Sequence, residues 1–143
     1  MNSIIQNIAI VVPVYNEQEI IKTVITDLKN KLSNTNYKII ILNDGSTDRT
    51  WEQLKIFTND EKVLLINKKN EGHGKTLIRG YKLALEMGLD YIVQIDSDDQ
   101  IPIDEFKKLI KFKNKYDFVV GNRLNRDDPF TRILISGFMK SII

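Results

Sequence analysis

The sequence predicts an α/β fold in which a doubly wound, mostly parallel sheet carries helices on both faces. Five short apolar runs rich in Ile and Val alternate with segments of helical periodicity along the 143 residues. Such alternation is typical of parallel strands joined by right-handed helical crossovers. The runs are almost continuously apolar, which indicates strands that are buried on both faces.

The expected strands come at intervals along the chain, and a polar cluster follows each of them. The strands are residues 8–12, 38–42, 63–66, 91–95 and 118–120. The clusters are residues 13–17, 43–48, 67–75, 96–100 and 121–126. Ligands of doubly wound folds bind at the carboxyl ends of the strands, so these clusters hold the candidate site residues.

Helical periodicity separates the expected strands. Apolar residues recur in segments 20–32, 51–54, 77–85 and 106–110 at a spacing that places them on one face of a helix. Ser46, Thr47 or Asp48 is expected to cap the helix that contains Trp51.

Composition is that of an ordinary globular protein, with 42% hydrophobic and 28% charged residues. The length suits one domain, so residues 1–143 are expected to form a single domain. The apolar end at Ile143 is abrupt, and we expect this domain to continue beyond it. The absence of cysteine excludes thiolate metal sites and a cysteine nucleophile.

The charge is uneven along the chain. From Lys107 onward, nine Lys or Arg residues stand against three Asp residues. This basic region could face anionic lipid or a phosphate substrate, or it could be the solvated face of a lysine-rich helix. No apolar run reaches the ~18 residues of a membrane span, so no span is expected.

Two carboxylates follow the fourth expected strand. Asp96 and Asp98 are separated by Ser97, and side chains at i and i+2 of an extended segment can converge on one point. Gln100 adds an amide oxygen at the same period. This all-oxygen set suits Mg²⁺ or Mn²⁺, and the alternative is a turn cluster that caps the following helix.

The clusters after the first two strands contain candidate nucleoside contacts. Asp44 lies at the end of the second expected strand, where a carboxylate could hydrogen-bond a base or ribose. Tyr15 follows the first strand and could stack on a base or cover the edge of the sheet.

Residues 72–76, Gly-His-Gly-Lys-Thr, open a helix, and the N-terminus of a helix favours phosphate. A P-loop would need glycine at the position of Lys69, so the segment does not indicate an ATPase. His73 is the single histidine, and a loop histidine between two glycines more often faces solvent than takes part in catalysis.

Taken together, four motifs resemble family-2 glycosyltransferases of the GT-A fold. They are Val-Pro-Val-Tyr-Asn-Glu at 12–17, Asn-Asp-Gly-Ser-Thr-Asp at 43–48, Gly-His-Gly-Lys at 72–75 and Asp-Ser-Asp at 96–98. Gly-Asn-Arg at 121–123, Asn-Arg-Asp-Asp-Pro at 125–129 and Arg132 look like the polyprenyl-phosphate subgroup, which includes dolichyl-phosphate mannose synthases and undecaprenyl-phosphate sugar transferases. One residue departs from the pattern, because Asn43 stands where the family usually has Asp.

The resemblance implies a role for each matching residue. The nucleotide-sugar-binding residues would be Pro13, Tyr15, Glu17, Asp44, Gly74, Lys75 and Asp96. The metal ligands would be Asp96, Asp98 and Gln100. The catalytic residues would be Asp98, Arg123 and Arg132, and the two arginines match positions that hold the acceptor phosphate.

The resemblance therefore implies inverting, metal-dependent transfer of a sugar from a UDP- or GDP-linked donor to a polyprenyl phosphate. The expected location is the cytoplasmic face of a membrane, with peripheral membrane contact and no nucleic-acid partner, in the biogenesis of the cell envelope. Two alternatives stay open. One is a family-2 transferase that extends a polysaccharide or glycan, and the other is a nucleotide-binding module without turnover.

Overall fold

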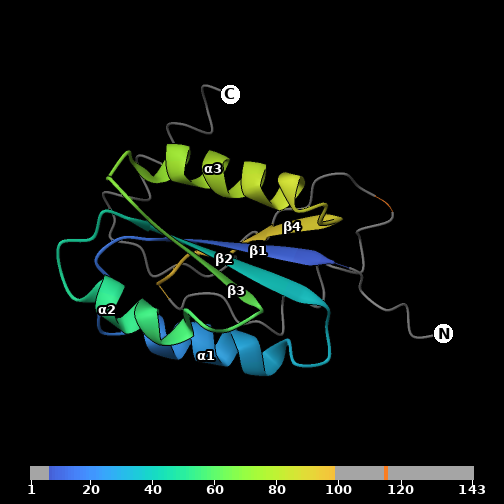
Figure 1. Cartoon of the computed structure of the whole chain (residues 1–143), viewed down its shortest axis with the longest axis horizontal. Coiled ribbons are helices and arrows are strands. Elements are labelled where there is room, and N and C mark those ends of the chain that lie inside the picture. The colour runs from blue at the N-terminus through green and yellow to red at the C-terminus, as the bar shows by residue number, and fades with distance from the viewer. Residues whose placement is uncertain (1–6, 99–114, 116–143) are drawn as a thin grey trace, which may run out of the picture. The chain divides into compact units, whose positions relative to one another are not determined.

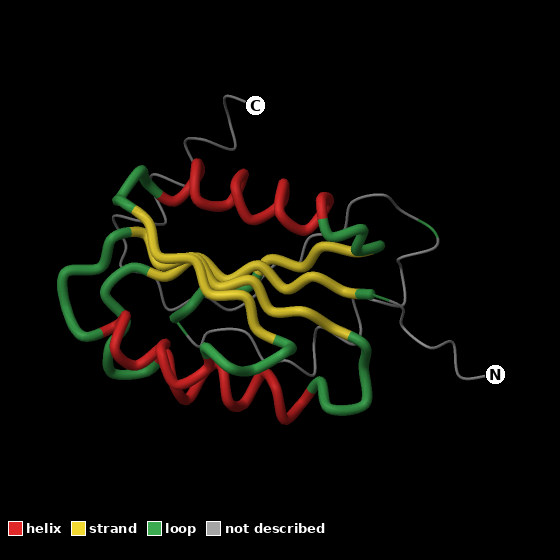
Figure 2. The backbone as a smooth tube through the Cα atoms, viewed as in Figure 1, coloured by secondary structure: helices red, strands yellow, loops and turns green. Residues whose placement is uncertain are grey.

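The computed structural model describes residues 7–98 and Lys115. Within these residues, four parallel strands form one sheet in the order β3-β2-β1-β4 (Figures 1 and 2). The strands are Ile8–Val14 (β1), Tyr37–Asp44 (β2), Val63–Lys68 (β3) and Tyr91–Gln94 (β4). The chain adds β2 and β3 on one side of β1 and then crosses to the other side, so the strand order reverses between β1 and β4.

Helices cover both faces of this sheet. They are α1 (Ile21–Lys31), α2 (Thr50–Leu54), which continues into the 3₁₀ turn η1 (Lys55–Phe57), and α3 (His73–Glu86). Figure 1 shows α3 on one face and α1 with α2 on the opposite face. The prediction of a doubly wound, parallel α/β sheet is confirmed for the part of the chain that the structure describes.

The core follows from the alternation of side chains along β1 and β2. Both central strands are buried along their length, apart from the half-buried Lys38. Ala9 and Val11 of β1 and Ile40 and Leu42 of β2 form one buried cluster with Ala84 of α3. The side chains at the intervening positions point to the other face, where α1 buries Ile21, Val24, Ile25 and Leu28.

Gly80 lets α3 lie close to the sheet. A Cβ atom at this position would stand 2.4 Å from Cγ1 of Val11 and 3.0 Å from Cδ1 of Leu42. Any larger residue at this position would therefore overlap the side chains of β1 and β2, and the helix would have to move outward.

The expected elements agree with the structure except at their ends. β1 extends two residues beyond the predicted strand, to Val14. α3 begins at His73, before residue 77, where the apolar periodicity starts. Gly72 precedes it with a φ of 89°, a left-handed conformation that is not helical and that glycine adopts readily. The N-cap of α2 is Arg49, so none of the three expected caps stands at that position; Asp48, one residue earlier, accepts a hydrogen bond from the Thr50 N–H (2.9 Å).

Some expected elements lie in parts of the chain that the structure does not describe. The predicted strand at 118–120 and helix at 106–110 lie outside the described residues, and a single domain over 1–143 stays a prediction. Between residues 7 and 98, no helix combines the length and the apolar character that crossing a membrane requires.

Gly80→Ala is expected to lower the free energy of unfolding by about 1–3 kcal/mol, because its Cβ would overlap Val11 and Leu42. Urea denaturation measures the change. Gly74→Ala in the same helix is the matched control, since a Cβ there meets nothing within 4 Å and alanine favours the helix. Equal destabilisation by the two variants would show that close packing at Gly80 is not the cause.

Candidate functional site

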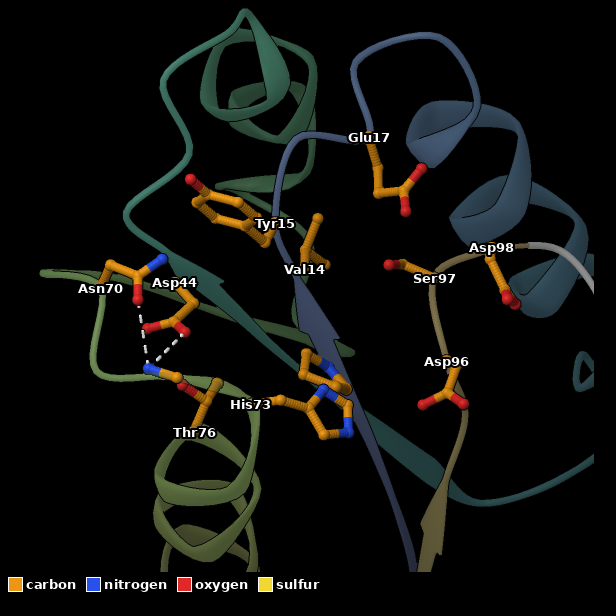
Figure 3. A pocket seen from close by; sticks show the side chains of 12 residues that line it. Val14, Tyr15, Glu17, Asp44, Asn70, His73, Thr76, Asp96, Ser97 and Asp98 are labelled. Carbon is orange, nitrogen blue, oxygen red and sulfur yellow. Dashed lines mark hydrogen bonds between the residues drawn. The ribbon is translucent and has the colours of Figure 1, made fainter. Parts of the chain in front are cut away.

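A pocket of about 370 Å³ lies at the carboxyl ends of the four strands (Figure 3). Every strand supplies part of its lining, either from its last residues or from the segment that follows it. The lining residues are Pro13, Val14, Tyr15, Glu17, Asp44, Asn70, Gly72, His73, Thr76, Asp96, Ser97 and Asp98. The strand order reverses beside this pocket, which is where doubly wound folds bind ligands.

The pocket brings together six of the residues singled out from the sequence. They are Pro13, Tyr15, Glu17, Asp44, Asp96 and Asp98. Gly74 and Lys75 are exposed in the first turn of α3 and are not among the lining residues. Gln100, Arg123 and Arg132 lie outside the described residues. The ligand roles of all these residues remain predictions.

Asn70, His73 and Thr76 line the pocket but were not predicted as site residues. His73 and Thr76 stand three positions apart on α3, and residues at this spacing share one face of a helix. That spacing is the signal that could have placed them together. Figure 3 shows His73, from the start of α3, on the side of the pocket that faces Asp96, from the segment after β4.

Asp44 is a buried anion that ties three segments together. Its carboxylate accepts hydrogen bonds from the backbone N–H groups of Glu71 (2.9 Å) and Gly72 (3.0 Å) and from the ammonium group of Lys68. Burial raises the pKa of Asp44, but the hydrogen bonds from Lys68 and the Glu71 N–H outweigh it and lower the pKa overall. Asp44 is therefore held as a carboxylate.

Lys68 is buried with it. Only 4% of the Lys68 side chain and 6% of the Asp44 side chain are exposed. The ammonium group also donates to the carbonyl of Lys69 (2.9 Å) and to the carboxylate of Glu71 (3.0 Å). Three acceptors thus satisfy the three N–H donors of Lys68, and the loop between β3 and α3 is fixed to the end of β2.

A chain of polar groups braces the neighbouring loops. Asn43, buried at the end of β2, donates to Oδ1 of Asn67 (2.7 Å) and accepts from the hydroxyl of Ser46 (2.5 Å). Ser46 in turn accepts from the Asn16 N–H (3.0 Å), and Asn16 accepts from the Thr47 N–H (2.8 Å). An ionised Asp at position 43 could not donate to Asn67, so the departure from the family pattern has a structural use here.

Backbone also meets backbone between the loops after β2 and β3. Gly45 has a φ of 69°, and a Cβ there would stand 2.6 Å from the backbone nitrogen of Asn70. Only glycine fits this contact without moving the pocket wall.

Negative charge gathers at the other side of the pocket. Asp96, Asp98 and Glu17 all line it. Burial raises the pKa of Glu17, and the negative charges of Asp98 and Asp48 raise it further. Mutual repulsion of this kind favours a cation among these groups.

The donor set fits a divalent cation of the Mg²⁺ type. Residues 7–98 and 115 contain no group of three His, Cys, Asp or Glu side chains that could hold a metal ion. Asp96 and Asp98 line the pocket and offer two carboxylates there, and Gln100, the third expected ligand, lies outside the described residues. Mg²⁺ is commonly held by one or two carboxylates together with water and phosphate oxygens, so two carboxylates suffice for a metal shared with a phosphorylated ligand.

Thr76 carries an unsatisfied polar atom at the wall of the pocket. The residue is fully buried, and its Oγ1 has no hydrogen-bond partner of standard geometry in the described part of the chain. The hydroxyl still lies close enough to Asp44 to contribute to the lowered pKa of that carboxyl. A small shift of either group would let the hydroxyl donate to Asp44.

Comparison with known proteins finds similarity to glycosyltransferases. The family model described as Glycosyl transferase family 2 matches residues 9–138. A dolichol-phosphate mannosyltransferase of Pyrococcus furiosus is 34% identical, with 90% of this chain and 38% of that protein covered. An undecaprenyl-phosphate 4-deoxy-4-formamido-L-arabinose transferase of Yersinia pestis is 32% identical, with 100% of this chain and 45% of that protein covered.

Among solved structures, glucosyl-3-phosphoglycerate synthase from Mycobacterium tuberculosis shares the fold. One of its structures has a TM-score of 0.61 at 22% identity, over 94% of this chain and 51% of that chain. Another, in complex with Mn²⁺, UDP-glucose and phosphoglyceric acid, has a TM-score of 0.51 at 26% identity, over 65% and 33%. This chain thus spans about half the length of these proteins or less.

Lys68→Met is expected to lower the free energy of unfolding at pH 7 by about 3 kcal/mol, because it leaves the buried Asp44 carboxylate without its cation. The pKa of Asp44 is lowered in the folded protein, so its stabilising contribution is present above the unfolded pKa of about 4 and is lost as the pH falls through the folded pKa. The difference between wild type and variant should therefore shrink in acid.

Urea denaturation at pH 7 and at pH 3 measures this pH dependence. Lys82→Met, which removes an exposed lysine of α3, is the control and should change stability little at either pH. A loss at Lys68 that stays the same at both values of pH would rule out Asp44 as its partner.

Proposed function

The chain belongs to glycosyl transferase family 2, and on this premise we propose that its pocket binds a nucleotide-sugar donor whose sugar is passed to an acceptor. The observation that carries the proposal is that the carboxyl ends of all four strands converge on one pocket, with Asp44 on one side and Asp96 and Asp98 on the other (Figure 3). A nucleoside diphosphate has a nucleoside end and a diphosphate end. The side of the pocket near Asp44 suits the nucleoside, and the acidic side, with a bound cation, suits the diphosphate.

The nucleoside is proposed to lie beside Tyr15 and Asp44. The Tyr15 side chain is 48% exposed at the pocket and offers a ring on which a base can stack. Asp44 is held ionised, so it can only accept hydrogen bonds from a base or ribose. Pro13 also lines the pocket, and Glu17 lines it on the acidic side, near Asp98.

The diphosphate is proposed to lie at the acidic side. Asp96 and Asp98, with Gln100, would hold Mg²⁺ or Mn²⁺, whose charge stabilises the nucleoside diphosphate as it leaves the sugar. The complex of the mycobacterial relative with Mn²⁺ and UDP-glucose supports this assignment. Gly74 and Lys75, in the first turn of α3, are proposed to meet donor phosphate near the N-terminus of that helix.

The acceptor is proposed to be a polyprenyl phosphate. The names of the Pyrococcus and Yersinia relatives, a dolichol-phosphate and an undecaprenyl-phosphate transferase, support this. A phosphate monoester has a second pKa near 6, so it is mostly a dianion at neutral pH and needs no general base. Arg123 and Arg132 would position it for attack opposite the leaving group, which inverts the anomeric centre. Such an acceptor would bring the protein to the cytoplasmic face of a membrane.

Asp98→Asn is expected to abolish metal-dependent nucleotide binding while the protein stays folded, because it removes one of the two carboxylates that are proposed to hold the metal. Calorimetric titration with UDP and GDP, each with and without Mn²⁺, measures the effect and names the base. Asp27→Asn, on an exposed position of α1, is the matched control. Unchanged nucleotide affinity of the Asp98 variant in Mn²⁺ would remove the clamp from the proposal.

Arg123→Ala, in a chain at least as long as this one, is expected to impair sugar transfer to a polyprenyl phosphate more than it weakens donor binding. A transfer assay with undecaprenyl phosphate and a titration with the donor measure the two effects. Equal losses would move Arg123 to the donor site. Donor binding by wild type without transfer to any acceptor would instead favour a binding module, and transfer only to a sugar hydroxyl would favour a glycan-extending enzyme.

A further inference from the structure

Asp96 is held by a side chain that does not itself reach the pocket. Gln94, the last residue of β4, donates from Nε2 to Oδ1 of Asp96 at 3.3 Å. The two residues are two positions apart, so both side chains project from the same side of the chain. Gln94 is absent from the residues that line the pocket, so its contact with the site runs through Asp96.

Gln94 is anchored in turn by α3. The hydroxyl of Tyr81 donates to Oε1 of Gln94 at 2.5 Å. The Tyr81 side chain is partly buried and packs against the cluster of apolar residues between α3 and the sheet. The hydroxyl is therefore positioned by a packed helix rather than by a loop.

The two hydrogen bonds that link Tyr81, Gln94 and Asp96 can run in only one direction. A carboxylate at Asp96 only accepts hydrogen bonds, so the NH₂ group of Gln94 must face it. The amide oxygen then faces Tyr81, whose hydroxyl can donate to it. A reversed amide would set oxygen against the carboxylate, and Asp96 would lose its donor.

Asp96 keeps acceptor capacity for a cation. The bond from Gln94 occupies one position on Oδ1, whereas a carboxylate offers about four. Groups that bond a metal-binding side chain from outside the coordination sphere orient that side chain and tune its affinity. Gln94 bonds Asp96 in this way, and Tyr81 bonds Gln94.

Building on the proposed donor site, we propose that Tyr81 and Gln94 are positioning residues that hold the Asp96 carboxylate in the orientation in which it binds a divalent cation with the donor diphosphate. α3 then contributes twice to the site. Its first turn supplies His73 and Thr76 to the wall, and Tyr81 further along the helix fixes a carboxylate that stands after β4.

The test is the Mn²⁺ concentration that half-saturates nucleotide binding, measured by titration of Mn²⁺ at fixed UDP or GDP. Gln94→Leu, which removes the amide at similar size, is expected to raise this concentration about 10-fold. Tyr81→Phe, which removes a single oxygen atom, is expected to raise it less but in the same direction. The thermal midpoint should stay close to wild type in both, and Gln53→Leu in α2 is the matched control.

The double variant tests whether Tyr81 changes the Mn²⁺ requirement through Gln94. Tyr81 acts through Gln94 in this proposal, so the double variant should need no more Mn²⁺ than Gln94→Leu alone. Independent structural roles would make the two losses add. Tyr81→Phe keeps the test decisive if Gln94→Leu fails to fold, because deletion of one hydroxyl leaves the packed ring in place.

The outcomes distinguish the positioning role of Tyr81 and Gln94 from the proposed donor site itself. Mn²⁺-dependent nucleotide binding by wild type with an unchanged half-saturating concentration in both variants would overturn the positioning role and leave the donor site standing. Additive losses accompanied by a lower thermal midpoint would also overturn it. No Mn²⁺-dependent binding by wild type would overturn both.

Discussion

The parallel direction of the four strands is the constraint from which the site follows. Each crossover returns the chain to the same end of the sheet, so four polar segments that are far apart in sequence come to lie at one edge. The reversal of strand order between β1 and β4 then separates the segments that follow these two neighbours and leaves room for a pocket between them. Buried apolar side chains cover both faces of β1 and β2, the strands that lead to the centre of this edge.

Different interactions hold the two sides of the pocket. The side near Asp44 depends on a buried ion pair with Lys68 and on backbone donors that cross from one loop to the next. Removal of one partner from such a pair leaves a buried charge, so its members depend on one another. The acidic side has a carboxylate that is joined to α3 through the neutral side chains of Gln94 and Tyr81, and negative charges there repel one another.

The fold was accessible from sequence because β-branched runs and helical periodicity alternate so regularly. Pocket-lining residues at or just after the end of a strand, such as Asp44 and Asp96, were accessible for the same reason. Lys68 and Gln94 were not, because their importance lies in contacts between elements that only the tertiary structure creates. Thr76 was missed because a threonine in a first helical turn is ordinary until its hydroxyl is found buried beside a pocket.

The contact between Gly45 and Asn70 limits how the pocket can change in evolution. A substitution at Gly45 would push on backbone rather than on a flexible side chain, and the left-handed conformation there disfavours other residues as well. Substitution is therefore poorly tolerated at Gly45, which packs against the pocket-lining Asn70. Positions whose side chains project into open space, such as Tyr15, can change with less effect on the backbone, so the two sequence positions differ in how freely they can vary.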